Sequence, residues 1–92
     1  MPTPAPIEPP SQENAEAYRA AVLAYRASFK AEREEHGPML MNFHIPKHAA
    51  AEAVLAVKPE LTYDQAFALA HSATAWAAQA HREWFWKGVS SV

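Results

Sequence analysis

The chain has 92 residues and a formal net charge of −2, with 8 Lys and Arg against 10 Asp and Glu, and it contains no cysteine. The acidic balance, without a basic run, disfavours nucleic-acid binding through phosphates, and the lack of thiols excludes disulfides, thiolate metal sites and thiol catalysis. A single domain of this size has thin net stability, so we expect it to complete its core with a partner.

The composition favours an all-α fold. Half of the residues are hydrophobic, and many of these are alanine, which favours helix more than it fills a core. The chain has only two glycines, and both stand where helices are expected to end. No stretch approaches the roughly 18 apolar residues of a membrane span, and the N-terminus has no secretory signal pattern. We therefore expect a cytoplasmic protein that makes no membrane contact.

Residues 1–10 contain five of the eight prolines. Because proline blocks both helix and sheet, this segment is predicted to be an extended, polyproline-like arm. The spacing of Pro6, Ile7 and Pro9 fits the minimal pattern for polyproline recognition, although that pattern is too common to identify a partner. We take these three residues as candidate contacts to a partner protein.

The first helix is predicted over 11–36, from Ser11 to the Gly37-Pro38 stop. One face of this helix carries a narrow stripe of mainly apolar residues in which Glu32 fills the gap before the last member, as in a helix that packs along another helix. The stripe consists of Tyr18, Val22, Tyr25, Phe29 and His36. A line of alanines follows the opposite side: Ala17, Ala20, Ala24, Ala27 and Ala31. We interpret the alanine line as a solvated face; the alternative is a second, close-packed helix contact.

A short helix is predicted over 47–58, after an apolar connection at residues 39–45 that we expect to pack as a buried loop. Pro46 stands at or near the first turn, where a missing N–H does no harm. Pro59 and the following Thr62 then reverse the chain into the last helix.

The last helix is predicted over 62–87. Thr62 and Gln65 have the spacing of a capping box, Asp64 favours the first turn, and Lys87-Gly88 end the helix. At helical spacing one face carries the core stripe, with Phe67 and Phe85 on its edge: Tyr63, Ala66, Leu69, Ala70, Ala73, Trp76, Ala77, Ala80 and Trp84. The other face is polar: Asp64, His71, Ser72, Gln79 and Arg82.

Trp86 falls on the polar face of this helix, two residues after Trp84. One interpretation is that the helix frays before Trp86 and its ring folds back over the domain. The other is that Trp86 anchors a partner, because tryptophan is enriched among interface hot spots. We take Arg82, Trp84, Phe85 and Trp86 as the C-terminal candidate binding residues.

Five histidines are the remaining candidates for site chemistry: His36, His44, His48, His71 and His81. His44 and His48 have the spacing of a helical metal pair, but Pro46 between them implies that His44 precedes the helix. His71 and His81 do not share a helical face. A metal or haem site would therefore need a tertiary meeting of His44, His48 and His71. No phosphate loop, HExxH motif or nucleophile elbow is present.

Together these features predict an all-α, three-helix domain over 11–92, with two long antiparallel helices, a short crossing helix and an extended N-terminal arm. The predicted function is non-catalytic binding to another protein or to a second copy, without a cofactor or nucleic acid. The protein would be an accessory or assembly subunit, or a small inhibitor of a larger complex, including one encoded by a phage. The alternative is a helical metal- or haem-binding protein that uses its histidines.

Overall fold

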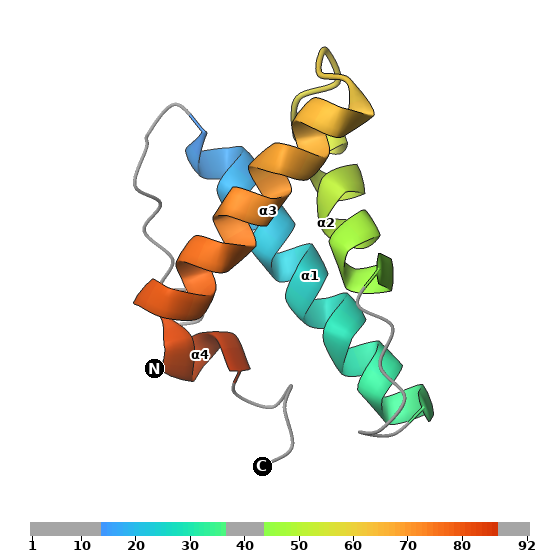
Figure 1. Ribbon diagram of the computed structural model, residues 1–92, viewed down its shortest axis with the longest axis vertical. Coiled ribbons are helices and arrows are strands. Elements are labelled where there is room, and N and C mark those ends of the chain that lie inside the picture. Colours follow the sequence, from blue (N-terminus) through green and yellow to red (C-terminus); the bar gives the residue numbers. More distant parts are fainter. Residues whose placement is uncertain (1–13, 37–43, 87–92) are drawn as a thin grey trace.

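The computed structural model describes residues 14–36 and 44–86. The predicted arm at 1–10 and residues 39–43 of the connection predicted over 39–45 lie outside the described residues. His44 and Ile45, the end of that connection, are exposed residues of a helix, so their assignment to a buried loop is corrected. Four helices follow one another: α1 (Ala15–His36), α2 (His44–Val57), α3 (Tyr63–Ala80) and the short α4 (Arg82–Trp86) (Figure 1). The described residues contain no strand. The all-α class with three longer helices is therefore confirmed.

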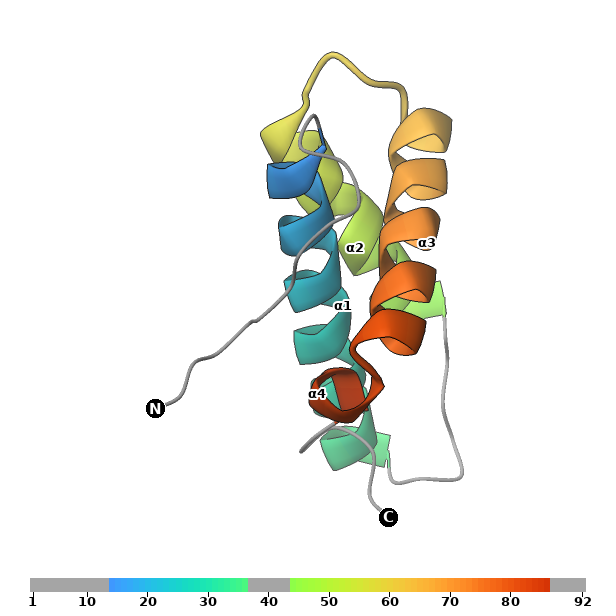
Figure 2. The same ribbon diagram turned by 90° about the vertical axis from the view of Figure 1, so that its left-hand side faces the viewer.

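The direction of the helices follows from their connections. Figure 2 shows α1 and α3 running the same way, while α2 runs against both. The ring contacts agree with these directions. The ring centroid of Tyr18 in α1 lies 6.0 Å from that of Trp76, and the centroid of Tyr25, further along α1, lies 5.8 Å from that of Phe85. Each connection reverses the chain, and two reversals restore the original direction. The two long helices, α1 and α3, are thus parallel, so their predicted antiparallel packing is corrected, while α2 is antiparallel to each of them.

The start of α3 matches the predicted capping box. The Gln65 N–H donates to Thr62 Oγ1 at 3.1 Å, and the Thr62 N–H donates to Gln65 Oε1 at 2.9 Å. Asp64 lies in the first turn. A cap of this kind contributes about 1 kcal/mol to helix stability. The box fixes the point at which the chain turns from α2 into α3.

The start of α2 differs from its prediction, because the helix begins at His44 rather than at residue 47. Pro46 is the third residue of the helix and is buried. The first four N–H groups of a helix have no partner within it, so a proline in the first turn removes no hydrogen bond. The inference that His44 precedes the helix is therefore corrected, and His44 and His48 lie one turn apart on α2.

The core is built mainly from alanine. Four alanines of α3 are buried, as the core stripe predicted: Ala66, Ala70, Ala73 and Ala77. They belong to one cluster with Ala17, Ala21 and Val22 of α1 and Ala50 and Val54 of α2. Such small side chains let helix backbones approach closely, so larger residues of the stripe, Leu69 and Trp76, pack at the rim. On α1 the alanine line is divided, with Ala17 buried and Ala27 and Ala31 exposed.

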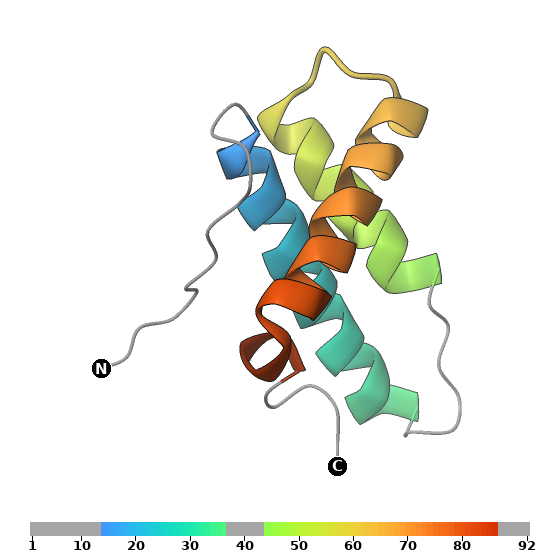
Figure 3. The same cartoon turned by 60° about the vertical axis from the view of Figure 1, so that its left-hand side comes forward.

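The predicted last helix is broken near its end. α3 stops at Ala80, His81 has φ −128° and ψ 48°, and α4 begins at Arg82. Figure 3 shows α4 (red) turned out of the α3 axis. The His81 carbonyl accepts a hydrogen bond from the Phe85 N–H at 2.8 Å. The bend redirects the residues that follow, so the single helix predicted over 62–87 does not describe their orientation.

Candidate functional site

Phe85 is a core residue. Its side chain is 2% exposed, and its ring stacks on Tyr25 with centroids 5.8 Å apart and planes 28° apart. The sequence pattern placed Phe85 only at the edge of the core stripe. Burial also raises the pKa of the Tyr25 phenol, because desolvation disfavours the charged form. Phe85 is therefore not an exposed anchor for a partner, although it lines part of a hollow beside Tyr25.

Arg26 of α1 holds α4 in place. Its Nε donates to the Phe85 carbonyl oxygen at 3.1 Å, and its guanidinium carbon lies 4.8 Å from the Trp84 ring centroid. A cation over an indole face contributes about 0.5–1 kcal/mol at exposed sites. Sequence reasoning missed Arg26, because no local spacing links it to a residue 59 positions away.

Trp84 lies between core and solvent. It packs against the core cluster but keeps intermediate exposure, whereas the sequence predicted a fully core position. The bend at His81 is the reason, because it rotates Phe85 inward and leaves Trp84 at the rim. Beside Trp84 is an open hollow of about 550 Å³, lined by Gln79, Ala80, His81, Arg82, Glu83 and Trp84.

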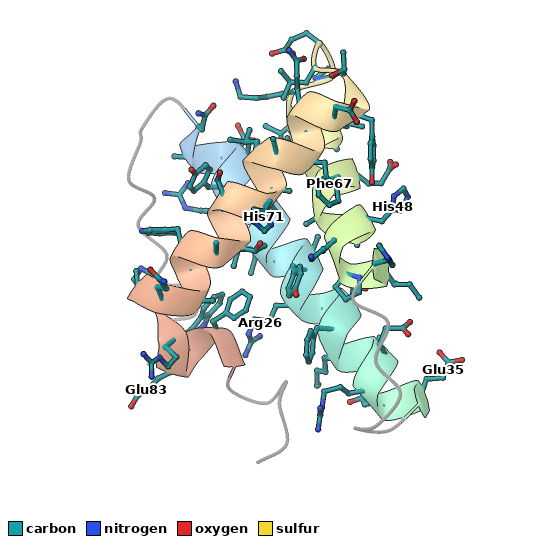
Figure 4. The ribbon with its side chains drawn as sticks, in the orientation of Figure 1. Arg26, Glu35, His48, Phe67, His71 and Glu83 are labelled. Carbon is teal, nitrogen blue, oxygen red and sulfur yellow. The ribbon has the colours of Figure 1, made fainter. Side chains whose placement is uncertain are left out.

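The hollow beside Trp84 carries charges of both signs. Arg82 and Glu83 are both exposed, and Figure 4 shows Glu83 pointing away from the helices (Figure 4). We call the surface formed by residues 79–84 the Trp84 surface. An ordered aromatic ring beside two opposite charges suits recognition of a polar protein surface.

Four of the predicted binding residues are not tested by these contacts. The side chain of Trp86, at the end of α4, lies outside the described side chains, and so do Pro6, Ile7 and Pro9. Their roles remain predictions. Of the predicted C-terminal set, the structure brings Arg82 and Trp84 together at one surface and places Phe85 in the core.

His48 is engaged on both ring nitrogens. Its Nδ1 lies 3.0 Å from the Tyr63 hydroxyl and its Nε2 lies 3.4 Å from Glu52 Oε2. Figure 4 places His48 on the outer side of α2 and His71 on α3. Among residues 14–36 and 44–86, no group of three or more His, Asp or Glu is placed to hold a metal ion. The metal or haem alternative stays a prediction.

The Glu52, His48 and Tyr63 side chains form a short relay, an arrangement that activates a nucleophile in some enzymes. The side chains of His48 and Glu52 are more than half exposed, and Tyr63 is 40% exposed. Catalytic electrostatics depend on a site that excludes water. We therefore interpret this relay as a tie between α2 and the start of α3.

No protein-family model, curated protein sequence or solved structure matches this chain. Among the described helices, none combines the length and apolar character that crossing a bilayer requires.

Proposed function

We propose that this protein is a non-catalytic binding protein that contacts another protein through the Trp84 surface. The observation that carries the proposal is the state of Trp84, which is partly exposed and yet has the Arg26 guanidinium carbon 4.8 Å from its ring centroid. An accessory or assembly subunit, or a small inhibitor of a larger complex, fits this arrangement.

Preorganisation is the physical argument for binding. Ordering a rotamer-rich side chain costs about 0.5–1.5 kcal/mol on association, and a ring already fixed by Arg26 avoids part of that cost. Tryptophan and arginine are also the residue types most enriched among interface hot spots. The neighbouring hollow gives space for a partner's side chains around the exposed indole edge.

The test compares Trp84→Ala with Leu23→Ala. Leu23 is a matched control, since it is a large apolar residue of α1 with 47% exposure and lies outside the Trp84 surface. The immobilised full chain is used to capture binding proteins, and each captured protein is then purified and titrated. Sedimentation of the full chain measures self-association in parallel.

Trp84→Ala is expected to weaken association about 30-fold, which corresponds to loss of a hot spot of roughly 2 kcal/mol. Leu23→Ala is expected to change it less than about threefold. Circular dichroism checks that both variants keep their helical content. Equal weakening by the two variants, or no association of the wild-type chain with any protein, would contradict the proposal.

A further inference from the structure

A second hollow lies on another part of the molecule, where α2 begins and α3 crosses α1. It has a volume of about 180 Å³, and its apolar wall is formed by Tyr25, Ala75, Ala78 and Phe85. A smaller adjoining hollow shares Tyr25 and continues toward Phe67. We call the two together the α2–α3 groove. Figure 4 shows Phe67 and His71 on the side of α3 that faces α2.

The α2–α3 groove is lined by basic side chains. Lys47 and His71 line both hollows, and among the described residues no Asp or Glu lines either one. Within residues 14–36 and 44–86, no carboxylate pairs with the Lys47 ammonium. Lys47 also lies in the first turn of α2, which has no acidic residue and where the helix N-terminus adds partial positive charge.

The remaining hydroxyl at the rim does not change this balance. Thr74 Oγ1 donates to the Ala70 carbonyl oxygen at 3.0 Å, so its proton is already used within α3. The Thr74 oxygen can then only accept, so the donors that a ligand meets above the apolar wall are the Lys47 ammonium and a ring N–H of His71. Such a combination is complementary to an apolar group that carries a carboxylate.

The size of the groove limits the apolar group. The larger hollow, at about 180 Å³, is below the roughly 300–1,000 Å³ of pockets that enclose a whole small-molecule ligand. The groove therefore has room for one large apolar side chain and not for a whole helix face.

We propose that the α2–α3 groove binds a segment of a partner protein in which a large apolar side chain stands next to an acidic residue. The apolar side chain fills the space between Tyr25, Ala78 and Phe85, and the carboxylate lies against Lys47 and His71. This inference rests on the proposed protein-binding function, and it adds a second contact with its own chemistry.

The experiment is an NMR titration of the ¹⁵N-labelled full chain with two matched peptides. One is N-acetyl-Glu-Phe-Glu-amide, and the other is N-acetyl-Gln-Phe-Gln-amide, which has nearly the same shape without the charges. Ligands of this size bind with a Kd on the order of 1 mM. The acidic peptide is expected to bind about fivefold tighter, since a partly exposed ion pair has that effect. Amide signals of Lys47, Ala75 and Ala78 are expected to shift.

Four variants of the chain test the assignment. Lys47→Gln is expected to reduce affinity for the acidic peptide to that for the neutral one, whereas Lys58→Gln, with the same charge loss just after α2, is expected to leave it unchanged. Ala78→Phe fills the groove and is expected to abolish binding of both peptides, with the dispersion of the spectrum as the check of folding. Trp84→Ala is expected to keep the peptide affinities, which separates this inference from the Trp84 surface.

Equal affinity for the two peptides would overturn the charge assignment, and shifts confined to other residues would overturn the site. A control titration with 3-phenylpropionate distinguishes a small acid from a protein segment. Binding of that acid without binding of either peptide would overturn the proposed partner. If the peptides bind but Trp84→Ala does not weaken association with a protein, the proposed function is refuted and the groove is supported.

Discussion

Two regions of the molecule are packed in opposite ways. One is the crossing of α3 over α1 and α2, and the other is the end of the molecule around α4. At the crossing the buried side chains are mostly alanines, such as Ala70 and Ala73, which are 2% and 0% exposed. Around α4 the contacts are made by large side chains, with Phe85 stacked on Tyr25 and Trp84 beneath Arg26. Close backbone approach leaves no room for large residues, so they gather where α3 ends and α4 turns back. The closely packed small side chains lie in one region, and the large aromatic side chains lie in the other.

The largest effect is expected from Phe85→Ala. Deleting this buried ring, with its stacking on Tyr25, should lower the free energy of unfolding by about 3–5 kcal/mol. Urea denaturation followed by circular dichroism measures the change. A loss of less than about 1 kcal/mol would show that α4 does not contribute to the core. The proposed difference in packing between the two regions would then be wrong.

The alanine crossing is tested by enlarging a side chain. Ala73→Leu is expected to lower the free energy of unfolding by about 1–3 kcal/mol, because a close-packed position has no space for three more carbons. Ala68→Leu, at an exposed position of the same helix, is the control and should stay within about 0.5 kcal/mol of the wild type. Equal stability of the two variants would mean that the helices do not approach as closely as described.

A double-mutant cycle on Arg26 and Trp84 measures the link between α1 and α4. Arg26→Met and Trp84→Leu, alone and together, should give a coupling energy of about 0.5–1 kcal/mol from the cation–π contact. Denaturant unfolding of the four proteins supplies the numbers. Additive single effects would indicate that Arg26 holds α4 only through its hydrogen bond to the Phe85 carbonyl.

The smallest effect concerns the alkaline limit of stability. Burial raises the pKa of Tyr25 above its ordinary value of 10.0, so the phenol ionises first in the unfolded chain. This contribution is fully present below about pH 10 and is lost as the pH rises through the folded pKa, so the free energy of unfolding falls there. Tyr25→Phe should make that alkaline slope shallower. An unchanged slope would place the Tyr25 hydroxyl in solvent.

Local signals in the sequence predicted the parts of the fold that local energetics decide. The capping box at Thr62 and Gln65 needs only two side chains three residues apart, and it forms as predicted. The buried alanines of α3 follow from helical periodicity alone. The sequence predicts the first residue of α2 less accurately, since Pro46 is compatible with several starting residues within one turn.

The bend at His81 had no such signal. Neither Gly nor Pro occurs between Ala80 and Arg82, and the helical period continues through them. The competing contacts are tertiary, namely Tyr25 against Phe85 and Arg26 against Trp84, and they come from a distant part of the chain. Because the bend at His81 changes the direction of the chain, Phe85 faces the core and Trp84 lies at its rim. That is why the sequence assigned Trp84 to the core and Phe85 to its edge.

The most direct test asks which of these two neighbours faces Tyr25 in solution. A ¹³C-edited NOE spectrum of the full chain reports proximity between ring protons. The account predicts cross-peaks between the Tyr25 and Phe85 rings and between the Arg26 side chain and the Trp84 indole. Cross-peaks from the Trp84 indole to Tyr25, with none from Phe85, would show that α3 continues straight and that Trp84 is the core residue.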